Sequence, residues 1–280
     1  MFYRRAPAVQ EEKSLGPRFR GDERGTLTTL PRREESGYEP FMTPEISVVV
    51  PVYDEEGNVA ALAREIARAF DGRDYEMIFV DDASRDGTRA ALLALKPELP
   101  ALRVIAHARN AGQSRALRTG ALYARGEIVV TLDGDGQNDP ADAPALVDGF
   151  TAASPMVGMV GGRRVKRRDS WSKRWASKIG NGVRRRLLND GAEDTGCGLK
   201  VISRAVLLAL PYFDHMHRYL PALVRREGLR ADYLDVSHRP RGSGRSKYTN
   251  WRRLWVSLGD LVGVIWLLQR ARPPGEVSEA

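Results

Sequence analysis

The sequence predicts an α/β fold in which a Rossmann-like, mixed but mainly parallel sheet is flanked by helices. Two observations support this class. Short apolar runs typical of buried strands alternate with longer segments that have helical spacing. Acidic residues follow several of the apolar runs, at the end of a parallel strand where ligands usually bind. With 280 residues, 42% of them hydrophobic, the chain can bury a sizeable core.

The first 43 residues precede this alternation. They carry mixed charges and scattered Gly and Pro without a sustained period, so we expect a disordered or misassigned extension over 1–43. Our hypothesis is that translation starts at Met42. The folded domain is expected over 44–250, followed by a C-terminal amphipathic helix and tail over 251–280.

Strands and helices then alternate in a regular order. Continuous apolar runs such as ISVVVPV are typical of strands that are buried on both faces. The expected strands are 46–52, 75–80, 102–107 and 127–132. The expected helices between them are 58–70, 84–95 and 113–124, of which the second opens with capping residues.

Carboxylates follow three of these strands. They are Asp54 and Glu55, Asp81 and Asp82, and Asp133 and Asp135. The last pair can approach one divalent cation, and its oxygen ligands suit Mg²⁺ or Mn²⁺. Gly134 and Gly136 leave room there for a bulky anionic ligand. Asp139, which precedes Pro140, is instead expected to cap a helix.

The formal charge of +8 is concentrated in two stretches. Lys and Arg dominate 163–186, where Asp169 is the single acid, and 239–253, which has no acid. Such clusters favour phosphate-bearing partners, with solvated basic helix faces as the alternative. A nucleic-acid-binding protein would also carry them, but acids at the strand ends would repel a phosphate backbone. An NAD-dependent enzyme is disfavoured because no G-x-G-x-x-G follows the first strand.

Three further features limit the functional classes. The single cysteine, Cys197, excludes an internal disulfide and a cysteine-rich zinc site. His215 and His217 can bind a metal as an alternating pair, but packing or hydrogen bonding is the preferred interpretation. The apolar run 254–268 is interrupted by Asp260 and is too short to span a bilayer, which favours an interfacial or packed helix.

Six motifs, in this order and spacing, resemble those of family 2 glycosyltransferases with the GT-A fold. They are SVVVPVYDEEGNV, FVDDASRDGT, NAGQSRALRTG, LDGDGQNDP, DTGCGLK and RGSGRSK. The resemblance is to the dolichol-phosphate mannose synthase branch, which includes bacterial polyprenyl-phosphate sugar transferases, and it covers 46–248. Asp54, Gly57 and the run 197–199 depart from the branch, which leaves the sugar and the base undetermined.

The resemblance implies a metal-dependent, inverting transfer of a sugar from a GDP- or UDP-linked donor to an undecaprenyl or dolichyl phosphate. Asp133 and Asp135 would hold Mg²⁺ or Mn²⁺. Arg241 and Lys247 would lie on a catalytic loop that closes over the donor diphosphate or the acceptor phosphate. The implied residues of the nucleotide-sugar site are Pro51, Tyr53, Glu55, Asp81, Asp133, Gly134, Asp135, Gln137 and Arg163.

The chemistry of the acceptor separates two hypotheses. A lipid phosphate is already ionised at neutral pH, so it needs cations and no general base. A saccharide or protein hydroxyl needs a base, for which Asp194 is the candidate. The basic second half favours the phosphate acceptor. We therefore expect a peripheral protein on the cytoplasmic face of the plasma membrane, held by its C-terminal helix or by a separate membrane subunit, with no nucleic-acid partner.

Overall fold

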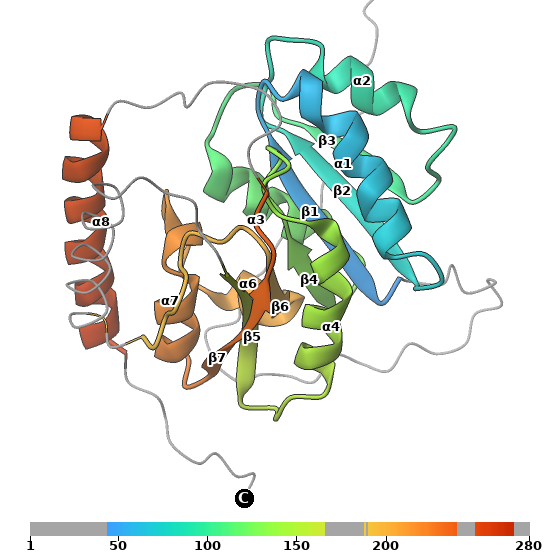
Figure 1. The fold of residues 1–280 in the computed structure, drawn as a ribbon. Helices are drawn as coiled ribbons and strands as arrows, with labels where there is room; N and C mark the ends of the chain where they lie inside the picture. Colours follow the sequence, from blue (N-terminus) through green and yellow to red (C-terminus); the bar gives the residue numbers. More distant parts are fainter. Residues whose placement is uncertain (1–43, 166–187, 189, 240–249, 272–280) are drawn as a thin grey trace, which may run out of the picture. The chain divides into compact units, whose positions relative to one another are not determined.

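The computed structural model describes residues 44–165, 188, 190–239 and 250–271, all of which belong to the unit Met42–Ala280 (Figure 1). Side chains between 250 and 257 are not described. The expected extension over 1–43, most of the first basic stretch and the RGSGRSK loop lie outside the described residues. The domain boundaries therefore stay a prediction.

The strands of the described residues form one sheet in the order β3-β2-β1-β4-β6-β5-β7 (Figure 1). Their bounds are β1 Ile46–Val52, β2 Tyr75–Asp81, β3 Leu102–Ala106, β4 Ile128–Thr131, β5 Val157–Arg164, β6 Lys200–Ser203 and β7 Arg230–Val236. The first four strands pair in parallel. The strand β6 runs antiparallel to β4 and β5, and β7 is parallel to β5. The expected mixed, mainly parallel sheet is confirmed.

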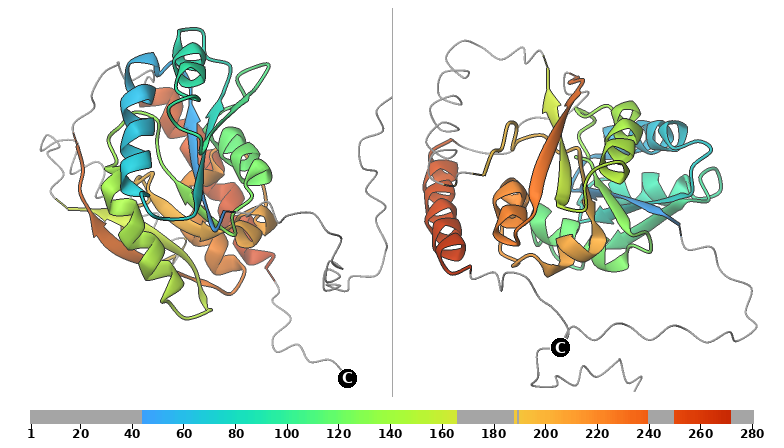
Figure 2. Two further views of the ribbon diagram at one scale, coloured as in Figure 1. Left: turned by 90° about the vertical axis from the view of Figure 1, so that its right-hand side faces the viewer. Right: turned by 90° about the horizontal axis from the view of Figure 1, so that it is seen from below.

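Helices cover both faces of this sheet (Figures 1 and 2). Their bounds are α1 Glu56–Ala69, α2 Thr88–Ala94, α3 Gln113–Tyr123, α4 Ala143–Thr151, α6 Arg204–Ala209, α7 Leu220–Arg226 and α8 Asn250–Gln269, with the short 3₁₀ helices η1 Pro140–Asp142 and η2 Met216–Arg218. Asp139 caps η1 through a 3.0 Å hydrogen bond that its Oδ1 accepts from the backbone of Ala141, as expected.

Alternation along the central strands divides the core in two. Val48 and Val50 of β1 pack with α1, α2 and α4 on one face. Val49 of β1 and Ile78 of β2 pack with α3, α6 and α7 on the other. Successive side chains of a strand point to opposite faces, so an apolar run with no alternation must be covered on both sides. This is why the run ISVVVPV forms a central strand.

The C-terminal helix α8 packs on the second of these cores, beside α7 (Figures 1 and 2). Val264 is its buried contact, and Arg226 of α7 donates a hydrogen bond to the carbonyl of Leu267 over 3.3 Å. Within the described residues, we find no helix with the length and apolar character that crossing a membrane requires.

Candidate active site

Asp133 and Asp135 follow β4, which lies between β1 and β6 at the centre of the sheet. The loop that carries them passes close to β1. A Cβ at Gly134 would lie 2.6 Å from Val52 Cγ1 and 3.0 Å from the carbonyl oxygen of Pro51. Gly136 has a φ of +71°, a backbone conformation that residues with a side chain rarely adopt. The path of the loop therefore requires both glycines.

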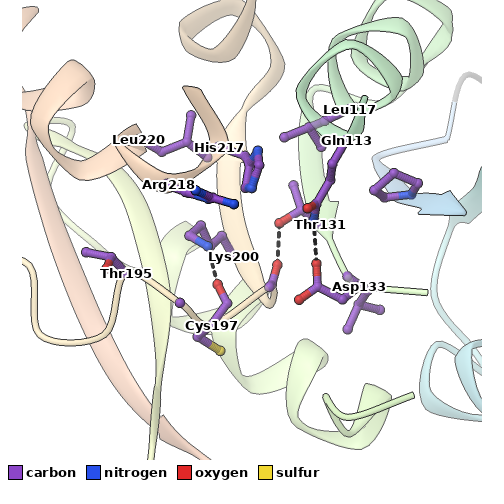
Figure 3. Close-up of a pocket in the computed structure, with 14 residues that line it drawn as sticks. Gln113, Leu117, Thr131, Asp133, Thr195, Cys197, Lys200, His217, Arg218 and Leu220 are labelled. Carbon is purple, nitrogen blue, oxygen red and sulfur yellow. Dashed lines mark hydrogen bonds between the residues drawn. The ribbon is translucent and has the colours of Figure 1, made fainter. Parts of the chain in front are cut away.

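A cavity of about 220 Å³ opens beside Asp133 (Figure 3). Its walls come from β1, α3, β4, the loop before β6, and the segment from η2 into α7. The lining residues are Pro51, Gln113, Leu117, Thr131, Leu132, Asp133, Thr195, Gly196, Cys197, Gly198, Lys200, His217, Arg218 and Leu220. Thr131 ties two of these walls together, since its hydroxyl donates to the carbonyl of Gly198 over 2.6 Å.

The carboxylate of Asp133 is held from two sides. Gln113 Nε2 donates to its Oδ1 over 2.8 Å (Figure 3). A side chain at Gly198 would overlap it. Burial and the nearby charge of Asp135 raise the pKa of Asp133, while Lys200 and other groups oppose that shift.

A divalent cation between Asp133 and Asp135 would relieve their mutual repulsion, so the pair fits the Mg²⁺ or Mn²⁺ site expected from the sequence. Its remaining ligands would be substrate oxygens and water. Among the described residues there is no cluster of three or more His, Cys, Asp or Glu arranged to bind a metal.

The residues expected to hold the nucleotide lie on two adjacent turns. Pro51 lies near the end of β1, Glu55 follows that strand, and Asp81 ends the neighbouring strand β2. Asp81 is buried and accepts a 2.9 Å hydrogen bond from the backbone of Ser84. Glu55 accepts one of 2.6 Å from Asn58. Parallel pairing of β1 with β2 therefore brings these side chains to one edge of the sheet.

The turns after β1 and β2 also brace each other. The backbone N–H of Asp54 donates to Ser84 Oγ over 3.0 Å, and the N–H of Arg85 donates to Asp54 Oδ1 over 2.7 Å. Asp54 and Ala83 both have positive φ. Tyr53 lies half-buried between Val52 and Asp54. Gln137 lies further along the loop after β4, where its N–H donates to Asp135 Oδ1 over 3.1 Å.

Asp82 has a structural role that the sequence interpretation did not assign. It is buried, and its two oxygens accept hydrogen bonds of 2.8 Å each from the backbone N–H groups of Ala111 and Gly112. His107 Nδ1 lies 2.7 Å from the same carboxylate. These contacts hold the segment from which α3 begins, and Gln113 is the first residue of α3. Asp82 thus positions the side chain that holds Asp133.

The two arginines at the end of β5 differ in their surroundings. Arg163, which was expected to face phosphate, is exposed and bonds to Asp235 and Glu193 instead of lining the cavity. Arg164 is largely buried and pairs with Asp194 through two hydrogen bonds of 2.7 and 2.8 Å. Asp194, the candidate general base, therefore already accepts a hydrogen bond on each of its two oxygens. Arg241 and Lys247 lie outside the described residues.

Lys200 and His217 are among the lining residues that were not proposed as site residues from the sequence. Lys200 is 5% exposed, its ammonium donates to the carbonyl of Cys197, and burial lowers its pKa. His217 Nδ1 lies 2.8 Å from Ser114 Oγ, and burial lowers its pKa to about 3, so the imidazole is neutral. Lys200 ends the DTGCGLK motif, and this motif was the feature of the sequence that could have identified Lys200 as a site residue. Cys197 is buried.

A mixed sheet with paired carboxylates at the end of its central strand and a polar cavity beside them defines a GT-A-type protein. Residues 47–210 match the model of glycosyl transferase family 2, and the chain therefore belongs to that family. This confirms the resemblance found in the six motifs.

The curated relatives are transferases that act on lipid phosphates by name. The chain is 35% identical over 207 residues to an undecaprenyl-phosphate 4-deoxy-4-formamido-L-arabinose transferase from Edwardsiella ictaluri, a match that covers 72% of this chain and 62% of that protein. It is 32% identical over 242 residues to a dodecaprenyl-phosphate galacturonate synthase from Rhizobium johnstonii, covering 85% and 71%. The chain thus spans less than two thirds of the arabinose transferase.

Solved structures show the same fold. Glucosyl-3-phosphoglycerate synthase from Mycobacterium tuberculosis, in complex with Mn²⁺, UDP-glucose and glycerol 3-phosphate, matches with a TM-score of 0.61 at 20% identity, over 83% of this chain and 82% of that one. A mannosyltransferase from Pyrobaculum calidifontis, in complex with GDP-Man and Mn²⁺, matches with a TM-score of 0.59 at 23% identity, over 84% and 67%. At these identities the likeness carries the fold alone, which is the expected GT-A fold.

Proposed function

We propose that this protein transfers a sugar from a nucleotide-sugar donor to a polyprenyl phosphate, with inversion at the anomeric carbon. The observation that supports this most is the carboxylate pair at the end of β4, of which Asp133 lines a cavity together with Lys200 and Arg218. The names of the curated relatives, which include undecaprenyl-phosphate and dodecaprenyl-phosphate enzymes, support the choice of acceptor.

In this proposal Asp133 and Asp135 hold Mg²⁺ or Mn²⁺, which would neutralise the charge that develops on the departing diphosphate. Gln113 orients Asp133 for this task, and Gly198 leaves it the necessary space. The remaining donor contacts that we propose come from Pro51, Tyr53, Glu55, Asp81, Gly134, Gln137 and Arg163, with Arg241 and Lys247 closing over the phosphates.

The bond that forms joins an oxygen of the acceptor phosphate to the anomeric carbon, while the bond from that carbon to the donor phosphate breaks. The electron pair leaves with the nucleoside diphosphate. An ionised phosphate monoester attacks without losing a proton, so no general base is needed. The alternative, a hydroxyl acceptor, needs one. Both carboxylate oxygens of Asp194 already accept hydrogen bonds from Arg164, which favours the phosphate acceptor.

We further propose that α8 holds the protein peripherally on the cytoplasmic face of the plasma membrane, alone or with a separate membrane subunit. Leu258, Val262 and Trp266 are spaced four residues apart on α8 and are all exposed, with exposed fractions of 44%, 67% and 56%. Three large apolar side chains on one face of a helix suit an interfacial position.

The decisive experiment is a transfer assay with labelled GDP- and UDP-sugars, Mg²⁺ or Mn²⁺, and undecaprenyl phosphate. Label that enters the organic phase only with metal and lipid would support the proposal and identify the donor. Label that moves to a saccharide or protein without lipid phosphate would instead establish the hydroxyl acceptor. Hydrolysis or binding of the donor with no transfer to lipid would contradict the proposed acceptor.

A further inference from the structure

The cavity beside Asp133 contains a buried cation with no assigned task. Lys200 is 5% exposed and lines the cavity (Figure 3). An ammonium group has three donors. It donates to the neutral carbonyl of Cys197, and the nearby carboxylates of Asp133 and Asp194 attract its charge. Burying an ammonium costs free energy unless an anion compensates it. Asp194 is already paired with Arg164 and Asp133 is assigned to the proposed cation, so the ammonium of Lys200 at the wall of this cavity favours an anionic ligand inside.

Two more polar side chains line the cavity. Arg218 and its neighbour His217 come from η2 and face the same cavity (Figure 3). Ser114 holds His217 in place, because its Oγ accepts a 3.3 Å hydrogen bond from the backbone of His217 and lies 2.8 Å from the ring Nδ1. The neutral imidazole offers hydrogen bonding without a third charge, and two cations face the single carboxylate of Asp133 across the cavity.

The position of the cavity separates it from the nucleotide turns. Pro51 is the one residue of the proposed base and ribose contacts that lines it, whereas Tyr53, Glu55 and Asp81 do not. The opposite wall, from η2 into α7, packs on α8. His215 Nδ1 lies 3.1 Å from Asp260 of α8. The cavity therefore lies between the metal-binding carboxylates and the segment that contacts the helix with the exposed apolar face.

We propose that Lys200, Arg218 and His217 form the pocket for the phosphate monoester of the acceptor lipid. This inference rests on the proposed function and adds to it the residues that bind the phosphate of the acceptor lipid. The donor diphosphate belongs with Asp133 and Asp135, on the side of the nucleotide turns, while a lipid phosphate arrives from the side of α8. The two cations offset the repulsion between the approaching phosphates, which would otherwise keep the acceptor from the anomeric carbon.

The first test measures binding without any donor. Full-length protein is titrated with farnesyl phosphate by calorimetry, beside the variants Lys200→Met and Arg218→Gln. Loss of one charge-assisted hydrogen bond to phosphate should weaken binding about 10- to 100-fold in each variant. Arg64→Gln is the matched control, because Arg64 is an exposed arginine of α1 that pairs with Glu98. This variant should bind farnesyl phosphate as tightly as wild type.

A purely structural role for Lys200 would instead lower the midpoint of thermal unfolding in Lys200→Met. Methionine replaces a buried ammonium with an apolar side chain of similar length, so the midpoint of thermal unfolding should stay the same or rise. Farnesol, which lacks the phosphate, should bind Lys200→Met and wild type equally. Unchanged affinity for farnesyl phosphate in both variants would overturn the proposal, as would a wild-type protein that does not bind farnesyl phosphate.

A second titration distinguishes the donor phosphates from the acceptor phosphate. UDP and GDP with Mn²⁺ should bind Lys200→Met and Arg218→Gln as tightly as wild type. Weakened nucleotide binding with unchanged farnesyl phosphate binding would assign the pocket to the donor and overturn the proposal.

Failure of the pocket is distinguishable from failure of the proposed function. Wild-type transfer to undecaprenyl phosphate, with an unaltered KM for that lipid in Lys200→Met, would overturn the pocket and leave the function standing. Farnesyl phosphate binding that depends on Lys200 and Arg218, without transfer from any donor, would support the pocket and contradict the function.

Discussion

At the scale of single residues, the site depends on how little space surrounds Asp133. Gly198 lies against one side of its carboxylate and Gln113 holds the other. The neighbouring charge of Asp135 adds repulsion that only a cation or a proton can relieve. The position of this carboxylate is therefore set by a glycine from a different part of the chain, in the loop before β6.

Gly198→Ala tests this dependence. The added methyl group would overlap the Asp133 carboxylate and move it away from its partner, so we expect Mn²⁺-dependent binding of UDP or GDP to weaken at least about 10-fold. Calorimetric titration measures this loss. Gly259→Ala is the control, because a Cβ there meets nothing within 4 Å and an alanine in α8 should be neutral or slightly stabilising. Equal nucleotide affinity in both variants would contradict the steric argument.

His217 predicts a dependence of stability on pH. Its pKa is about 3 in the folded protein and near the ordinary value of 6.5 in the unfolded chain. Between these values the unfolded chain binds a proton that the folded protein does not. The free energy of unfolding should therefore fall as pH is lowered from 6.5 toward 3, by up to about 1.4 kcal/mol per pH unit. Urea unfolding of wild type and His217→Gln at several pH values should show the steeper fall in wild type. Parallel curves would show that His217 is not buried as a neutral ring.

At the scale of elements, the segment between β3 and α3 owes its position to one carboxylate. Asp82 accepts hydrogen bonds from the backbone of Ala111 and Gly112 and contacts His107. Gly112 has φ +86°, which lets the chain turn into α3 directly after these contacts. Gln113, the first residue of α3, then contacts Asp133. Asp82, a buried acid after β2, therefore positions the side chain that holds Asp133.

Asp82→Asn should destabilise the protein by about 2–4 kcal/mol, because an amide group in place of one oxygen cannot accept from both N–H groups and leaves one of them unsatisfied. Chemical denaturation measures this loss, and nucleotide binding should weaken as well because Gln113 shifts. Asp232→Asn, on the exposed part of β7, is the control and should change stability by less than about 0.5 kcal/mol. A variant as stable as wild type would show that this segment is held by other contacts.

The exposed face of α8 leads to another prediction. Val262 is 67% exposed, so Val262→Asp should not change the midpoint of thermal unfolding, whereas a charge on this face should weaken association with a membrane. Flotation with phosphatidylglycerol vesicles should recover several-fold less of this variant than of wild type. Leu93→Asp, at an exposed apolar residue of α2, should float like wild type. Equal flotation of Val262→Asp and wild type would remove α8 from the membrane contact.

At the scale of the whole folded unit, the site lies where two halves of the sheet meet. The strands β3, β2, β1 and β4 are parallel, and β6, β5 and β7 add the antiparallel pairings. The parallel half brings the turns after β1 and β2, where we propose that the nucleotide binds, to the same edge as Asp133 and Asp135. The loop before β6 supplies Gly198, and β6 supplies its first residue, Lys200, from the other half. Both halves are therefore needed to complete the cavity.

The described contacts all belong to the unit that begins at Met42. A chain that starts at Met42 should therefore unfold at the same temperature as the full 280 residues and bind UDP, GDP and farnesyl phosphate with the same affinity. Differential scanning calorimetry and the titrations described above measure both properties. A lower unfolding temperature for the shortened chain would show that residues 1–41 contribute to the folded unit.

Much of the first half of the fold could be predicted from local patterns. Buried parallel strands are continuous apolar runs, and the helices between them have a clear period, so β1 to β4 and α1 to α3 were expected near their actual bounds. In the second half, only the motifs and the C-terminal helix were predicted, the helix from the apolar run 254–268. Of the strands in this half, β6 has four residues and β7 mixes charged with apolar residues, and such segments carry a weak local signal.

The sequence by itself determined the fold class, the family and the carboxylate pair after β4, because periodicity and short motifs are properties of neighbouring residues. Only the tertiary structure decided which distant side chains meet. It turned Arg163 toward Asp235 and Glu193, engaged Asp194 with Arg164, and placed Lys200 beside His217 and Arg218. The reason is physical: a cavity is formed by the packing of elements from many parts of the chain, and no local pattern records which of their side chains will share it.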